Sequence, residues 1–76
     1  MPDVNARLTS ENLPEILRGL RLAHNKYQNY MVSKLDTTPK TVRKWEETGR
    51  IKFHNLVQYL DVLGYEVVIR RKRSDH

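Results

Sequence analysis

The side chains best equipped for chemistry in this sequence are the cations and hydroxyls of one short central segment. Lys40, Arg43 and Lys44 supply positively charged hydrogen-bond donors, and Thr38 and Thr41 add hydroxyl groups that both donate and accept. Cations near the N-terminus of a helix oppose the helix dipole, so an external anion is the expected partner. This set favours the binding of phosphate groups and nearby acceptor atoms.

A well-specified helix is predicted to carry these side chains. Thr38 is a good N-cap, and Pro39 suits the first helical position because the N–H that it lacks would have no helical partner there. Val42 and Trp45 are three residues apart, so they share one face and are expected to anchor the helix in a core. The cationic side chains then point elsewhere, towards solvent and a partner.

The remaining composition argues against an enzyme or a metalloprotein. The sequence shows no paired carboxylates, no nucleophile with a base and no glycine-rich phosphate loop. Cysteine is absent, and His24, His54 and His76 are too far apart for short-range metal-ligand spacing. We therefore expect no catalysis, no cofactor and no bound metal.

The overall charge agrees with an anionic partner without identifying one. The net charge is +5, from 14 basic and 9 acidic residues, but the adjacent residues Arg70 to Arg73 supply four of these positive charges. No apolar run approaches the ~20 residues of a membrane span, and the N-terminus lacks a basic region followed by an apolar one. A cytoplasmic protein without membrane contact is expected.

Hydrophobic spacing predicts a mostly α-helical fold of four to five helices that share one core. Asn12 and Glu15 have the spacing of a capping box, so the first helix is expected to begin there. Asn25 tolerates the left-handed conformation that ends a helix. The second helix is expected to begin at Tyr27, with Tyr27 and Tyr30 packed between helices.

The C-terminal third is expected to contain a helix and then a strand. Residues 53–63 have the apolar spacing of a helix that stops at Gly64, with Phe53, Leu56, Val57, Leu60 and Leu63 forming its stripe.

The run that follows Gly64 is rich in β-branched residues and predicts a strand. A lone strand leaves its backbone groups unpaired, so we expect it to pair with the same strand of a second copy. The residues assigned to this dimerisation contact are Tyr65, Val67, Val68 and Ile69. The alternative is that this segment packs its apolar side chains on its own core.

Several residues between Arg18 and Gly64 stand at the separations typical of one known family: Arg21, Gln28, Leu35, Thr38, Val42, Trp45, Glu46, Gly49, Leu63 and Gly64. With these residues in register, the chain from Arg18 to Gly64 resembles the lambda-repressor-like helix-turn-helix family, the Cro/CI or XRE-type DNA-binding domains. Hydrophobic spacing, composition and this resemblance together divide the chain into a flexible N-terminal arm (1–10), a helix-turn-helix domain (11–64), a dimerisation strand (65–70) and a basic flexible tail (71–76).

The resemblance also implies roles for individual residues. Arg21 is expected to pair with Glu46 and tie the first helix to the end of the recognition helix. The positions that face base edges are Pro39, Lys40, Thr41 and Lys44, and the expected phosphate contacts are Gln28, Arg43, Thr38 and Lys52.

The chain departs from the usual family pattern at three positions, and one extra residue, Thr48, stands between Glu46 and Gly49 relative to the commoner spacing. Tyr27 stands where threonine or serine is usual, Val32 where a small residue is usual, and Asp36 where glycine is usual. Asp36 can adopt the required turn conformation at modest cost.

The sequence therefore predicts a homodimeric repressor that binds double-stranded DNA at a pseudo-palindromic operator. The alternative is a protein-binding module, such as the antitoxin of a toxin–antitoxin pair or a phage-encoded inhibitor of a host protein. A stoichiometric protein partner and the absence of salt-sensitive DNA binding would distinguish this alternative.

Overall fold

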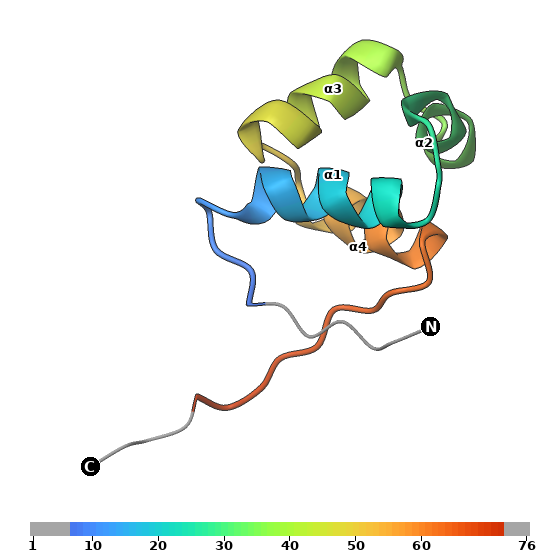
Figure 1. Ribbon diagram of the computed structural model, residues 1–76. Coiled ribbons are helices and arrows are strands. Elements are labelled where there is room, and N and C mark those ends of the chain that lie inside the picture. The colour runs from blue at the N-terminus through green and yellow to red at the C-terminus, as the bar shows by residue number, and fades with distance from the viewer. Residues whose placement is uncertain (1–6, 73–76) are drawn as a thin grey trace.

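The computed structural model describes residues 7–72, and this part of the chain contains four α-helices and no strand (Figure 1). The prediction of a mostly α-helical protein is confirmed. The helices are α1 (Leu13–Ala23), α2 (Gln28–Leu35), α3 (Pro39–Thr48) and α4 (Phe53–Val62). Within this part of the chain, no helix has the length and apolar character needed to span a membrane.

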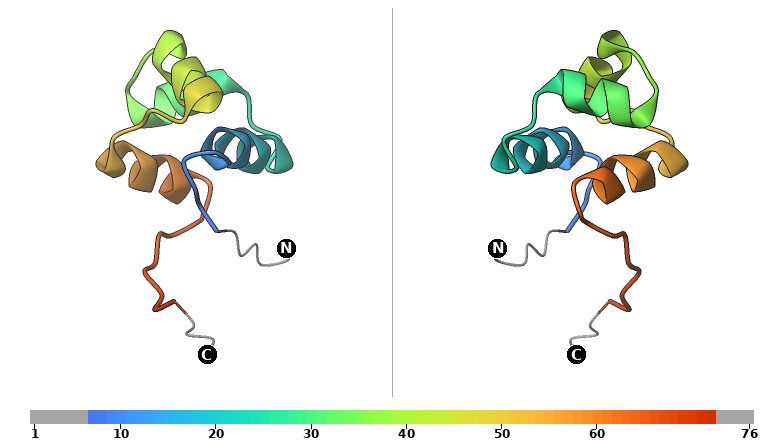
Figure 2. Two further views of the ribbon diagram at one scale, coloured as in Figure 1. Left: turned by 90° about the vertical axis from the view of Figure 1, so that its left-hand side faces the viewer. Right: turned by 90° about the vertical axis from the view of Figure 1, so that its right-hand side faces the viewer.

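The four helices form two layers. In Figures 1 and 2, α1 and α4 lie side by side, and α2 and α3 lie above them. α3 contacts both α1 and α2, and α2 also contacts α4. The segment after α4 leaves the helical body on the side opposite to α3 (Figure 2).

The core lies between the layers and draws on every helix. Trp45 of α3 and Tyr59 of α4 meet edge to face, with ring centroids 6.4 Å apart. Such aromatic pairs add to the burial of apolar area as a source of stability. The buried apolar residues are Leu17, Met31, Val42, Trp45, Tyr59, Leu60 and Leu63.

Four residues in the left-handed region end or join the helices. Asn25 and Asp36 have φ values of 57° and 50°, which agrees with their predicted turn conformations. Gly49 and Gly64 have φ values of 72° and 90°. A Cβ at Gly49 would lie 3.0 Å from the ring of Pro14, so glycine also allows the end of α3 to approach the start of α1.

The predicted capping box at the start of α1 is wrong. Asn12 has a helical backbone conformation and its side chain caps no helical N–H. A reciprocal pair forms one turn earlier: Asn12 Oδ1 accepts from Thr9 N at 2.7 Å, and Thr9 Oγ1 accepts from Asn12 N at 3.1 Å. Because Leu13 N donates to Thr9 O, the chain already turns before the helix begins.

Three residues predicted to pack are instead exposed. The side chain of Tyr27 is 82% exposed, and Phe53 and Val57 are 69% and 37% exposed. The buried face of α4 is turned towards Tyr59 and Leu60, which leaves Phe53 and Val57 at its margin. Tyr30, by contrast, packs against the core.

The predicted dimerisation strand lies in a segment without regular secondary structure, residues 65–72. Tyr65 and Val67 pack against the core, whereas Val68 is 66% exposed and Ile69 fully exposed. Most of the predicted arm (1–10) and the end of the predicted tail (71–76) fall at residues 1–6 and 73–76, which lie outside the described residues.

Candidate functional site

α3 has one buried and one exposed face. Val42 and Trp45 are buried, whereas Lys40, Arg43 and Lys44 are exposed. Lys40 and Lys44 are four residues apart and therefore lie on the same side of the helix. The two lysines predicted to read bases, Lys40 and Lys44, thus lie together on the solvent side of α3, and the opposite face of α3 packs in the core through Val42 and Trp45.

The start of α3 is fixed by its own hydroxyl groups. Thr38 Oγ1 accepts a hydrogen bond from Thr41 N at 3.2 Å and lies 2.9 Å from Thr41 Oγ1. Pro39 follows at the first helical position and is exposed. These contacts define the rotamers of Thr38 and Thr41 and the direction in which the helix leaves the turn.

A buried ion pair holds the other end of α3 against α1. Arg21 Nε donates to Glu46 Oε2 and Arg21 Nη2 donates to Glu46 Oε1, both at 2.8 Å. The two side chains are only 7% and 2% exposed. Because the arginine fork matches the two carboxylate oxygens, this bidentate pair fixes orientation as well as distance.

Neighbouring groups complete the hydrogen bonding of this pair. Tyr59 OH lies 2.8 Å from Glu46 Oε2 and 3.0 Å from the carbonyl of Leu17. Arg21 Nη1 donates to the carbonyl of Lys26 at 2.7 Å, which ties the loop before α2 to the network. Among the described residues, every buried side-chain polar atom has a hydrogen-bond partner.

The ionisation of the network follows from these contacts. Burial alone raises the pKa of Glu46, but hydrogen bonds from Arg21, Tyr59 and Gln28, together with the charge of Arg21, lower it below its ordinary value. The hydrogen bonds to Glu46 raise the pKa of Arg21. Burial and the adjacent Glu46 raise the pKa of Tyr59. Near neutral pH the network therefore contains carboxylate, guanidinium and neutral phenol.

Gln28 connects this network to the start of α2. Its Nε2 donates to Glu46 Oε1 at 3.3 Å, and the side chain is half-buried. Tyr27, the N-cap of α2, gives no side-chain cap, and the first turn contains no acidic residue. Tyr30 N already donates to the carbonyl of Tyr27 at 3.0 Å, so the N–H groups of Gln28 and Asn29 are the ones at the start of α2 that are left for an external anion.

A cleft of about 400 Å³ lies between α1, α2 and α3. It borders the buried Arg21–Glu46 pair and includes two exposed arginines. Its lining residues are Arg18, Arg21, Gln28, Arg43, Glu46 and Glu47. Two predicted phosphate-binding residues, Gln28 and Arg43, thus share one cleft, whereas Thr38 and Lys52 lie outside its lining.

Sequence reasoning missed several contacts. The buried hydroxyl of Tyr59 was not assigned, although Tyr59 has helical spacing with the apolar Leu56 and Leu63. His24 Nε2 lies 2.9 Å from Tyr65 OH, and their rings meet edge to face. No local pattern indicates this contact, because 41 positions separate the two residues.

Lys52 is exposed and is the N-cap of α4. In residues 7–72, no three metal-ligating side chains come together in a group that could hold a metal ion.

Comparison of the chain with protein-family models, with curated proteins and with solved structures gave no match.

Proposed function

We propose that this protein is a sequence-specific DNA-binding repressor in which α2 and α3 act as a helix-turn-helix. The two-sided character of α3 carries this proposal: Val42 and Trp45 are buried, and Lys40 and Lys44 are exposed together on the solvent side. A helix about 10–12 Å across with its side chains fits the major groove, which is about 12 Å wide.

In this proposal the exposed face of α3 reads base edges. Lys40 and Lys44 donate to the O6 or N7 of guanine, the acceptors that the major groove presents to cations. Thr41 bonds a base or a phosphate through its hydroxyl, which is also hydrogen-bonded to the hydroxyl of Thr38. Pro39 has no polar group to donate, so its ring contributes apolar contact, for example with a thymine methyl group.

The remaining assigned residues position the protein on the DNA backbone. Arg43 is exposed on the flank of α3, and Gln28 lies at the uncapped start of α2. Thr38 and Lys52 are exposed at the starts of α3 and α4. Contacts of this kind fix register without reading sequence.

The same proposal includes a homodimer formed by residues 65–70. Apart from the bond from Tyr65 N to Leu60 O, no backbone–backbone hydrogen bond involves residues 65–72 within the described chain. Val68 and Ile69 are exposed apolar side chains beside these unpaired backbone groups. Pairing with a second copy would cover both, and would set two α3 helices at a fixed separation for a pseudo-palindromic site.

Substitutions on α3 test the assignment of readers. Lys40→Ala and Lys44→Ala should each cost about 1–3 kcal/mol on the preferred DNA site, or roughly 5- to 150-fold in affinity, and relax preference at one base pair. The comparison variant Arg43→Ala should weaken binding to all DNA sequences by a similar factor. If Lys40→Ala and Lys44→Ala left both affinity and sequence preference unchanged, the proposed readers would be wrong.

The second candidate is a protein-binding module of the antitoxin or inhibitor type. The uncovered apolar side chains of Val68 and Ile69 favour it, because a different protein would cover them as well as a second copy would. Recovery of one stoichiometric protein partner in a pull-down, together with the absence of salt-sensitive DNA binding, would favour this candidate over the repressor.

A further inference from the structure

Two arginines in the cleft between α1, α2 and α3 have no acidic partner. Arg18 of α1 and Arg43 of α3 both line the cleft and are exposed. The ion pair between Arg21 and Glu46 is the only one in the described part of the chain. Arg18 and Arg43 therefore bring two positive charges to a cleft in which neither forms an ion pair, and Glu47 is the one carboxylate of its lining that is also unpaired.

The hydrogen bond between Gln28 and Glu46 orients a further donor in this cleft. An ionised carboxylate only accepts hydrogen bonds, so the amide nitrogen of Gln28, and not its oxygen, must face Glu46. One N–H of that nitrogen is used in this bond, and the second remains for another acceptor. The negative charge of Glu46 is balanced by the bidentate bond from Arg21.

We infer that this cleft holds one phosphate group of the DNA backbone and that Arg18 is one of its ligands. The inference rests on the proposed DNA binding and extends it, because neither the apolar spacing of α1 nor the family resemblance gives Arg18 a role. Arg18, Gln28 and Arg43 then contact the phosphate from three different helices. Such a contact fixes the angle at which α3 meets the DNA.

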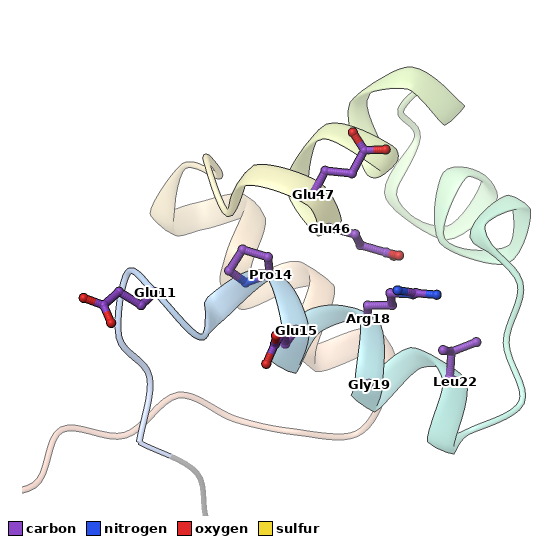
Figure 3. A pocket seen from close by; sticks show the side chains of 8 residues that line it. All are labelled: Glu11, Pro14, Glu15, Arg18, Gly19, Leu22, Glu46 and Glu47. Atoms are coloured by element: carbon purple, nitrogen blue, oxygen red, sulfur yellow. The ribbon is translucent and has the colours of Figure 1, made fainter.

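Glu47 supplies an opposing charge at the same site. It lines the 400 Å³ cleft and also the neighbouring groove of about 570 Å³ along α1 and α3. Figure 3 shows Arg18 extending from α1 into the space below Glu46, whereas the carboxylate of Glu47 is directed outward from α3. An unpaired carboxylate beside a phosphate repels it, so Glu47 should weaken the binding that Arg18 strengthens.

The test compares Arg18→Ala and Glu47→Gln, which should have opposite effects. Affinity for a short labelled duplex of mixed sequence is measured by fluorescence anisotropy over a range of salt concentrations. Loss of one phosphate contact should reduce the slope of log affinity against log salt by about 0.9, or about fivefold in affinity near 0.15 M salt. Arg18→Ala should show this loss, and Glu47→Gln should bind more tightly than the wild type.

Arg7→Ala is the matched control, because it also removes one arginine charge. Arg7 belongs to the segment before α1, and this segment extends from the helical body on the side opposite to α3 (Figure 2). Thermal unfolding of each variant checks that the fold is retained. If Arg18→Ala behaves like Arg7→Ala while Arg43→Ala binds more weakly, the role of Arg18 is refuted and the proposed function stands. If Glu47→Gln weakens binding, the phosphate site is likewise refuted. If the wild type shows no salt-dependent DNA binding, the proposed function fails too.

Discussion

Glu46 is the centre of the buried network, and replacing it with glutamine should destabilise the fold strongly. Its carboxylate accepts two hydrogen bonds from Arg21 and further hydrogen bonds from Tyr59 and Gln28. Glutamine has nearly the same shape but carries no charge, and it places an N–H₂ group where one of these donors points. The guanidinium of Arg21, only 7% exposed, would lose its counter-charge.

Removing one partner of a buried ion pair costs about 3–5 kcal/mol. At about 0.05–0.15 kcal/mol per residue, a chain of 76 residues has roughly 4–11 kcal/mol of stability, so Glu46→Gln removes a large fraction of it. For a domain of this size, each kcal/mol corresponds to about 4–8 °C in Tm. The expected decrease in Tm is therefore at least about 12 °C.

The assay is thermal and urea unfolding followed by circular dichroism at neutral pH. Glu47→Gln is the matched control, because it makes the same chemical change one residue further along α3 at an exposed position. The control should change stability by less than about 0.5 kcal/mol. A loss below about 1 kcal/mol in Glu46→Gln would show that the network contributes little to the stability of the fold, contrary to this reasoning.

Three further predictions concern stability. Gly19→Ala should stabilise the protein by up to about 1 kcal/mol, because a Cβ at Gly19 meets nothing within 4 Å. Gly49→Ala should destabilise it, because φ of Gly49 is 72° and a Cβ there would lie 3.0 Å from the ring of Pro14; urea unfolding of both variants measures the difference. Tyr27→Ser should raise Tm, because it adds an N-cap worth about 1 kcal/mol to α2 and removes a ring that is already 82% exposed. The pKa of Glu46 is lower in the folded chain than in the unfolded chain, so its contribution to stability is complete above the unfolded pKa of about 4.3 and is lost as the pH falls through the folded pKa. On acidification the urea midpoint of the wild type should therefore fall more steeply than that of Glu46→Gln. Parallel curves for the two proteins would contradict a lowered pKa of Glu46.

Local signals predicted the boundaries of α3 well. Thr38 and Pro39 specify its start, and Gly49 specifies its end, because each residue has a backbone or side-chain preference that acts within one turn. Asp36 likewise adopts the left-handed conformation expected of it.

The orientation of α4 could not be predicted in the same way. Its apolar residues fit two overlapping stripes, one with Phe53 and Val57 and one with Tyr59, and both include Leu60. Packing against the other helices selects the stripe with Tyr59, whose hydroxyl satisfies Glu46. The cleft was also beyond sequence reasoning, since Arg18 is brought there only by the packing of α1 against α3.

Selection of bound sequences from random duplex DNA, with sizing of the resulting complex, tests the central claim most directly. The proposed repressor should enrich a two-fold symmetric site and bind it as two copies of the chain. The spacing of the half-sites would then give the separation of the two α3 helices. Two results would contradict the proposed function. One is failure to enrich any sequence, and the other is a stable complex with a different protein in the absence of salt-sensitive DNA binding.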